Sequence, residues 1–315
     1  MFKQSGNKVF LFCLFVLMNS ANTKANVDEF FCFKAMTYNV LGIDFISEES
    51  LPFWSWNNRK PLIISLLKSS SPDLLGLQED STVQRDDIVV GLSGYGLVDT
   101  TLDGFSHRAI LYKKAVFSLV ESGEFFVKSG INRKGTWAKL RENKTGVMLF
   151  VINGHFIAGA SHSNILQRRI DAAVDFATKI ALYNTENSPI VMLGDLNGRF
   201  SDIYIQYLIS EKGAVPDVFY PDGFRKLNTP REWRYEANYD TRGLIWESTI
   251  DYVLTSDDLT FSQATRHNWR AYDEDGNLSF PFASDHPAIS EKICHGNVSY
   301  MVPILDSVLY HENEL

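Results

Sequence analysis

The sequence contains little cysteine, which narrows the kinds of site it can hold. Three cysteines occur among 315 residues, and Cys13 falls in an N-terminal apolar run that we expect to be cleaved. The remaining pair, Cys32 and Cys294, is too small for the usual tetrahedral zinc set. In an exported protein the two could form one disulfide that joins the first strand region to the last, and the alternative is two buried free thiols.

An excess of positive charge is also missing. The chain carries 30 Lys and Arg against 38 Asp and Glu, for a formal net charge of −8, and it has no basic tail or stripe. A protein that holds nucleic acid by electrostatics alone needs clustered Lys and Arg, so the sequence disfavours that class. A nuclease stays open, because a bound metal ion supplies positive charge locally.

Long apolar runs are absent beyond the N-terminus. Val9–Met18 is unbroken and apolar, follows Lys3 and Lys8, and precedes small residues that end at Ala25. This is the layout of a secretory signal peptide. The run is well short of the ~20 residues that cross a bilayer, so a membrane anchor is the weaker interpretation. We expect a secreted or periplasmic protein with no stable membrane span, and a monomer.

Internal repeats and low-complexity tracts are missing too, which argues against a solenoid. Hydrophobic residues make up 45% of the chain, enough for a sizeable core. We predict a signal peptide over 1–25, one domain over 26–294 and a short tail over 295–315. Glycosylation triplets, which matter only in a eukaryotic host, begin at Asn143, Asn277 and Asn297.

Short apolar runs with polar punctuation predict several strands. These runs lie at 33–40, 74–77, 109–112, 148–152, 190–193 and 250–254. The clearest helix is 165–182, in which Leu166, Ile170, Ala173, Ala177 and Ile180 share one stripe. A shorter helix, 59–68, stops before Ser71-Pro72. The strands are too many and too uneven for strict alternation with helices, so we predict an α/β fold with helices outside packed sheets.

Groups that bind cations or move protons follow most of these apolar runs. The motifs are Thr37-Tyr38-Asn39, Leu77-Gln78-Glu79, Asn153-Gly154-His155, Gly194-Asp195-Leu196-Asn197 and Ser284-Asp285-His286. A sixth, Ile250-Asp251-Tyr252, places a carboxylate within an apolar strand, which is costly unless the carboxylate is paired. One such residue is usually a cap or a turn. Six need a shared reason, and strand ends that meet at one edge of a sheet supply it.

Together these motifs resemble the endonuclease/exonuclease/phosphatase superfamily, the DNase I-like proteins, from about Phe33 to Ile293. Trp54–Arg59 and Gly135–Ala138 are most similar to its bacterial and CCR4-like branch. The resemblance implies a four-layer α/β sandwich of two packed β-sheets flanked by helices. It also implies a Mg²⁺-dependent (or Mn²⁺-dependent) hydrolase that cleaves a phosphodiester or phosphomonoester by metal-assisted attack of water.

The residue chemistry and the resemblance agree on a metal site. Asn39 and Glu79 offer hard oxygen ligands, which suit Mg²⁺ or Mn²⁺ rather than zinc. Glu79 is expected to be the chief ligand. Asp285 is expected to add a ligand or a water-mediated contact.

The remaining polar residues are expected to do the chemistry. Asp195 would orient or deprotonate the attacking water, and Asn197 would hydrogen-bond the phosphate oxygens. His286 would act on the scissile phosphate as general base or electrostatic stabiliser, with Asp251 holding its imidazole. His155 would contact phosphate or protonate the leaving group.

Two substrate contacts and three departures complete the resemblance. Arg133 is expected to clamp phosphate, and Asn153 is expected to contact substrate. Gly154 stands where the family usually has Thr, and Asp80 stands where an apolar residue usually follows the glutamate. Thr249 stands where Arg often precedes the Ile-Asp-Tyr motif, which weakens the expected phosphate contacts there.

The substrate stays open between nucleic acid, a lipid head group and a sugar phosphate. The alternatives are a DNase-like endonuclease and a sphingomyelinase-like lipid phosphodiesterase. A lipid enzyme often needs an exposed apolar or aromatic hairpin, for which Phe53–Trp56 and Phe280–Phe282 are candidates; the alternative for both is core or pocket wall. A different class, a secreted binding protein on an inactive enzyme fold, expects the loss of a catalytic group, whereas every expected group is present.

Overall fold

The computed structural model describes residues 30–45, 54–98, 108–127, 133–159, 164–209, 221, 225–229, 250–267, 271–272, 278–279 and 283–296. The predicted signal peptide, most of the predicted C-terminal tail, and the residues Thr249, Asn277, Asn297 and Phe280–Phe282 lie outside this part. Within it, none of the helices is both long and apolar enough to cross a bilayer.

Two six-stranded sheets form the centre of the molecule. The first sheet has, in spatial order, β11 (Leu259–His267), β14 (Ala288–His295), β1 (Phe31–Asn39), β2 (Leu74–Gln78), β4 (Ile110–Lys113) and β3 (Tyr95–Val98). The second has β5 (Phe117–Val127), β6 (Arg133–Glu142), β7 (Met148–His155), β8 (Ile190–Asp195), β10 (Asp251–Ser256) and β9 (Leu227–Asn228). Each sheet mixes parallel and antiparallel pairs, and β12 (Ala271–Tyr272) pairs separately with β13 (Leu278–Ser279).

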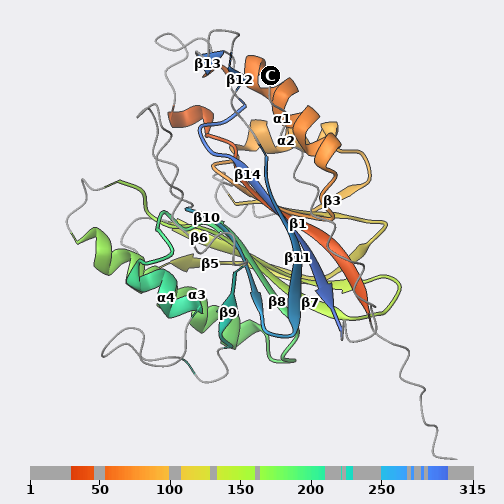
Figure 1. Cartoon of the computed structure of the whole chain (residues 1–315), viewed down its shortest axis with the longest axis vertical. Coiled ribbons are helices and arrows are strands. Elements are labelled where there is room, and N and C mark those ends of the chain that lie inside the picture. The colour runs from red at the N-terminus through yellow and green to blue at the C-terminus, as the bar shows by residue number, and fades with distance from the viewer. Residues whose placement is uncertain are drawn as a thin grey trace, which may run out of the picture.

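Helices cover the outer faces of both sheets (Figure 1). The helices α1 (Trp56–Ser70) and α2 (Thr82–Gly91) lie on the first sheet, and α3 (Ile165–Tyr183) and α4 (Ile203–Ile209) lie on the second. A short 3-10 turn, η1 (Ile43–Phe45), follows β1. The predicted four-layer α/β sandwich is therefore confirmed.

Three hydrophobic clusters hold these layers together. One joins α3 and α4 to the second sheet, one fills the space between the sheets, and one joins α1 and α2 to the first sheet. In the last cluster Ile63 and Leu67 of α1 are fully buried, and each such side chain contributes roughly 1.5–3 kcal/mol of transfer free energy. The middle cluster packs the two sheets face to face, which brings their edges together.

The apolar stripe predicted for α3 is correct except at its first residue. Ala173, Ala177 and Ile180 are buried, and Ile170 packs against the same cluster. Leu166, however, is 53% exposed. It lies in the first turn of the helix, before the part that reaches the hydrophobic cluster.

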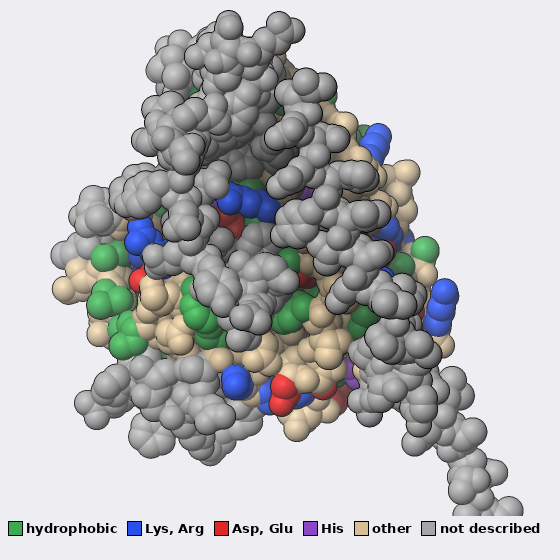
Figure 2. Space-filling view, in the orientation of Figure 1, with side chains coloured by type: hydrophobic (Ala, Val, Ile, Leu, Met, Phe, Trp, Pro, Cys, Tyr) green, Lys and Arg blue, Asp and Glu red, His purple; other side chains and the backbone are tan. Residues whose placement is uncertain are grey.

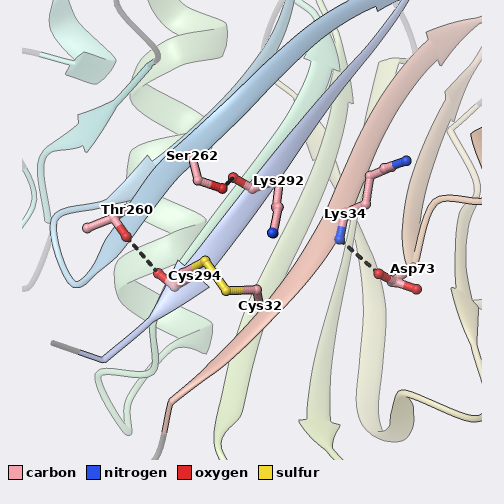
Figure 3. The surroundings of a disulfide bond; sticks show 7 residues. All are labelled: Cys32, Lys34, Asp73, Thr260, Ser262, Lys292 and Cys294. Atoms are coloured by element: carbon pink, nitrogen blue, oxygen red, sulfur yellow. Dashed lines mark hydrogen bonds between the residues drawn. A yellow bond between two sulfur atoms is a disulfide. The ribbon is translucent and has the colours of Figure 1, made fainter. Parts of the chain in front are cut away.

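The two mature cysteines form a disulfide between β1 and β14 (Figure 3). Cys32 and Cys294 lie directly opposite each other in the antiparallel ladder, with their Cα atoms 4.1 Å apart. Thr260 on β11 donates a hydrogen bond to the carbonyl oxygen of Cys294 at 3.3 Å. The bridge closes a separation of 262 residues. It lies near the start of β1, away from Asn39 at the other end of that strand.

Candidate active site

The polar motifs converge at one edge of the sandwich. β1 runs parallel to β2, and β7 runs parallel to β8, so the carboxyl ends of each pair lie together. β10 is antiparallel to β8, and β14 is antiparallel to β1, so the residues before and at their starts reach the same edge. The expected meeting of strand ends therefore involves two facing sheets rather than one.

Three predicted catalytic residues form a row across the second sheet. His155 ends β7, Asp195 ends β8, and Asp251 begins β10. Asp195 is the register partner of both His155 and Asp251. Laterally paired residues point to the same face of a sheet. All three side chains are buried, so their charges interact where solvent screens them little.

Side chains from both sheets converge on the Oδ2 atom of Asp195. It accepts a hydrogen bond from Asn39 Nδ2 at 3.0 Å. It also lies 3.5 Å from His155 Nε2 and 3.7 Å from His286 Nε2. The other oxygen, Oδ1, accepts the backbone N–H of Asn197 at 2.9 Å. The structure thus brings together four residues that the sequence places far apart, Asn39, His155, Asp195 and His286.

The Asn39 amide bridges two carboxylates. Its Nδ2 donates to Glu79 Oε1 and to Asp195 Oδ2, both at 3.0 Å, while its Oδ1 accepts the backbone N–H of Leu41 at 3.0 Å. Carboxylates only accept and a backbone N–H only donates, so this network fixes the amide orientation. In this arrangement Asn39 presents its donor to the two carboxylates, and its role as an oxygen ligand stays a prediction.

Glu79 is held at the edge of the site in a constrained backbone conformation. Its φ of 59° lies in the left-handed region, which is costly for a residue other than glycine and is typical of functional sites. Its Oε2 accepts the backbone N–H of Gly42 at 3.0 Å, and its Oε1 lies 3.8 Å from His155 Nε2. The side chain is 16% exposed, so it is reachable from solvent.

His286 is paired with a carboxylate that favours its protonated form. Its Nδ1 lies 2.9 Å from Asp251 Oδ2. Burial by itself lowers the pKa of His286, but the Asp251 and Asp195 carboxylates outweigh burial and hold the pKa well above its ordinary value. The backbone N–H of His286 donates to Ser284 Oγ at 3.2 Å, and Ser284 Oγ donates to the carbonyl oxygen of Asn39 at 2.6 Å.

The pKa of Asp195 is raised too, which in an acid favours the neutral form. Burial, followed by the neighbouring Asp251 carboxylate, raises the pKa of Asp195 to about 7, against the opposing effects of His286 and Asn39. A carboxylate with a pKa near neutrality can take up and release a proton at the working pH. The site therefore places a proton acceptor, Asp195, beside His286, whose protonated form is favoured.

Two tyrosines that have none of the sequence motifs' predicted roles hold the loop after β8. Tyr204 donates to the carbonyl oxygen of Asn197, and Tyr252 donates to that of Gly198, both at 2.8 Å. Asn197 has a φ of 49°, and its Nδ2 donates to the carbonyl oxygen of Phe156 at 3.0 Å. Tyr252 directly follows Asp251, and its place in a buried strand is the sequence signal that could have pointed to it.

Asn153 links the two sheets and does not face a substrate. Its Nδ2 donates to the carbonyl oxygens of Leu77 and Ala109 at 2.8 and 2.9 Å. Its Oδ1 accepts from Gln78 Nε2 at 2.8 Å. The side chain is fully buried, so the expected substrate contact is wrong, and the polar residue is explained by the carbonyl groups that it satisfies.

Two further site residues keep their roles as predictions. Asp285 is exposed, and its negative charge helps to raise the pKa of His286. Arg133 is the first residue of β6, three positions before Thr136, which pairs with Asn153. This end of β6 therefore lies at the same edge as the site, while the Arg133 side chain lies outside the described part.

The structure accounts for two of the three departures from the family pattern. A Cβ atom at Gly154 would lie 2.4 Å from Phe176 Cζ of α3, so a larger residue does not fit beside this aromatic ring. Asp80 is fully buried and points toward the start of β4, where it accepts the backbone N–H of Ala109 at 3.2 Å. Burial raises the pKa of Asp80 to about 7.

The donor set fits a hard divalent cation. Carboxylate oxygens of Asp195 and Asp251 lie within 4.8 Å of each other and of a His286 ring nitrogen, and Glu79 shares the Asn39 amide with Asp195. The protonated His286 is not itself a ligand. Among the described residues, the buried Asp251 Oδ1 has no hydrogen-bond partner. Carboxylate oxygens are the ligands of Mg²⁺ and Mn²⁺, and a divalent charge would offset the repulsion that raises the pKa of Asp195.

A family comparison agrees with this geometry. The sequence model of the Endonuclease/Exonuclease/phosphatase family matches residues 36–286. A search of curated protein sequences finds no match.

Solved structures share the fold. An endonuclease/exonuclease/phosphatase family protein from Bacteroides thetaiotaomicron aligns with a TM-score of 0.67 and 19% identity, over 84% of this chain and 98% of its own. A mannosyl-6-phosphatase from the same organism gives 0.63 and 19%, over 83% and 99%. The human Nocturnin catalytic domain gives 0.61 and 18%, over 84% and 96%. The resemblance to bacterial and CCR4-like members is thus confirmed at the level of the fold.

Proposed function

Because the chain belongs to the Endonuclease/Exonuclease/phosphatase family, we propose that it is a secreted hydrolase that cleaves a phosphate ester with the help of Mg²⁺ or Mn²⁺. The observation that carries the proposal is the convergence on Asp195 Oδ2 of Asn39, His155 and His286 from separate strands and loops. A structural core would not gather these groups at a strand edge. A reaction that needs both a base and a cation explains why these groups lie together there.

Glu79 and Asp285 are the proposed holders of the metal ion. Both offer carboxylate oxygens, and both are more accessible than the buried Asp195 and Asp251. When bound, a divalent ion polarises the phosphate and offsets the charge that develops on its oxygens. Asn39 supports this site through its hydrogen bond to Glu79.

Asp195 is the proposed acceptor of the proton from the attacking water. Its pKa of about 7 allows it to be ionised before the reaction and to hold the proton afterwards. His286 stays protonated, because Asp251 and Asp195 stabilise its imidazolium. It therefore serves as the electrostatic stabiliser of the phosphate rather than as the base. His155, 3.5 Å from Asp195, would contact phosphate or protonate the leaving group, and Asn197 would hydrogen-bond the phosphate oxygens.

Two observations bear on the substrate. On the described part of the face in Figure 2, Lys and Arg side chains are scattered and do not form a continuous patch, which gives a long nucleic acid no support. Trp56, one of the candidate membrane aromatics, is 6% exposed and packs in the α1 cluster. A small phosphate ester is therefore the favoured class.

A hydrolysis panel tests the proposed function. Metal-loaded protein would be offered DNA, RNA, sphingomyelin, inositol phosphates and sugar phosphates, and phosphate release or cleavage would be measured. We expect hydrolysis of at least one small ester and its loss in His286→Ala. Failure on every ester, or equal activity of the His286→Ala variant, would contradict the proposal.

Export is tested separately. The predicted signal peptide supports secretion, with cleavage after Ala25. The mass of the protein recovered from the medium or periplasm should correspond to a chain that begins at Asn26. Recovery of the full-length chain in the cytoplasm alone would refute export and leave the enzymatic proposal standing.

A further inference from the structure

Arg59 is a fully buried cation on the apolar side of α1. It is among the largest side chains with less than 2% exposure. Arg59, Ile63 and Leu67 are spaced four residues apart and form one buried stripe of the helix. A guanidinium is costly to remove from water. Arg59 is therefore expected to make interactions in this stripe that an apolar side chain could not make.

The guanidinium binds backbone carbonyl groups from three segments. Its Nε donates to the carbonyl oxygen of Trp54 at 2.7 Å. Nη1 donates to Val40 at 2.6 Å and to Ala283 at 3.3 Å, and Nη2 donates to Leu41 at 2.8 Å. The planar fork of Arg suits such divergent acceptors better than the single ammonium of Lys.

The segment that contains Val40 and Leu41 orients the side chains of Asn39 and Glu79. Leu41 has a φ of 55°, and its N–H donates to Asn39 Oδ1. The N–H of Gly42 donates to Glu79 Oε2. Because Arg59 holds the carbonyl groups of this same turn, it fixes the backbone that sets both side chains.

The segment that contains Ala283 orients His286. Ala283 precedes Ser284, whose hydroxyl donates to the carbonyl oxygen of Asn39 and accepts the N–H of His286. Ala283 lies 224 positions from Arg59 in the sequence. One side chain therefore reaches the backbone on both sides of the site.

We propose that Arg59 is a positioning residue that fixes the turn 40–42 and the loop 283–286 relative to each other. It sets Glu79 and Asn39 on one side and His286 on the other without touching a reacting atom. The role in catalysis rests on the proposed function. The joint positioning of the two segments does not.

The kinetic test compares Arg59→Met and Arg59→Lys with a matched control. Arg225→Met removes a guanidinium that also binds a carbonyl group, that of Asn187, and a carboxylate, that of Asp257, at the far end of β10. A displacement of about 1 Å at a site can cost ~100-fold in rate. We expect kcat to fall by about that factor in Arg59→Met with KM changed less than ~3-fold, since the substrate contacts are kept.

Arg59→Lys should recover part of the lost rate, because it keeps the charge and one donor, and Arg225→Met should match the wild type. A kcat for Arg59→Met within ~3-fold of the Arg225→Met value would overturn the positioning role in catalysis. An equal loss in both variants would show a general stability effect and would overturn it too.

Hydrogen exchange measured by mass spectrometry tests the joint positioning without any activity. Arg59→Met, or Arg59→Lys if the Met variant does not fold, should exchange faster than wild type at 40–43 and also at 283–287. The peptide over β8 should be unchanged. Faster exchange in one segment only, or in neither, would overturn the proposal. A wild type that hydrolyses nothing would instead refute the proposed function, while this exchange result would still decide the role of Arg59.

Discussion

Replacing Asp251 with Asn removes the negative charge beside His286 with little change in shape. Asp251 Oδ2 lies 2.9 Å from His286 Nδ1, and Asp251 is 3% exposed. Asp251 also repels the ionised form of Asp195, its cross-strand partner. The substitution therefore destabilises the protonated form of His286 and stabilises the ionised form of Asp195, so both pKa values should fall.

The size of the effect follows from the geometry. Two unit charges about 4 Å apart interact by about 4 kcal/mol at an effective dielectric constant of about 20. This energy changes the ratio of charged to neutral His286 by roughly a thousandfold. If the imidazolium stabilises the phosphate, kcat should fall by ~10² to 10⁴, the range seen when a positioned acid–base group or its orienting acid is lost.

The same charges set the direction in which the pH dependence of kcat changes. In the wild type, activity should rise as Asp195 ionises, near pH 7, and should fall only where His286 loses its proton, well above the ordinary range of histidine. In Asp251→Asn both limbs should move to lower pH, because the Asp195 pKa and the His286 pKa both fall.

The assay is the pH dependence of kcat on an aryl phosphate ester, with the His286 pKa followed by NMR. Asp258→Asn is the matched control, since Asp258 lies beyond the other end of β10 and pairs with Arg225. An Asp251→Asn variant with both limbs unmoved and kcat within ~3-fold of wild type would refute the assignment of His286 as a paired cation.

Three further predictions concern stability. Gly154→Thr should destabilise the fold by ~1–3 kcal/mol in urea unfolding, because its Cβ would lie 2.4 Å from Phe176 Cζ; Phe176→Leu in the same chain should recover part of the loss, and an additive loss would contradict the steric reason. Burial raises the pKa of Asp80 from 3.8 to about 7, so the unfolded chain ionises first and the wild type should lose stability relative to Asp80→Asn as pH rises between these values; parallel urea midpoints across that window would contradict this. Replacing Cys32 and Cys294 with Ser should cost ~2–5 kcal/mol of stability and leave kcat unchanged, and a lower kcat in the folded variant would contradict the distance of the bridge from the site.

The fold was predictable wherever apolar runs were short and bounded. The run at 190–193 becomes β8, and the stripe of 165–182 becomes α3. The edge strand β5 was not predicted, because from Ser118 to Ser122 its side chains are exposed in succession and show no alternation. Helical periodicity likewise does not show where the neighbouring sheet ends, so it does not predict that Leu166 is exposed.

The site was predictable as a set of residues and less so as a set of bonds. Asp195, Asp251 and His286 are adjacent in space as the ordered motifs predict. The amide of Asn153 differs from expectation, since the groups that an amide faces depend on partners supplied by other strands. Arg59 was visible only as part of a family signature, although its place on the buried stripe of α1 was a readable signal.

In the proposed reaction water attacks a phosphate ester, with Asp195 as the proton acceptor and a metal ion held by Glu79 and Asp285. The most direct measurement is hydrolysis of bis(p-nitrophenyl) phosphate and p-nitrophenyl phosphate by EDTA-treated protein before and after addition of Mg²⁺ or Mn²⁺, with Glu79→Gln and Asp195→Asn in parallel. The predicted result is that EDTA abolishes hydrolysis, either ion restores it in the wild type, and neither restores it in the variants. Hydrolysis of equal rate in EDTA, or full restoration in Asp195→Asn, would contradict the claim.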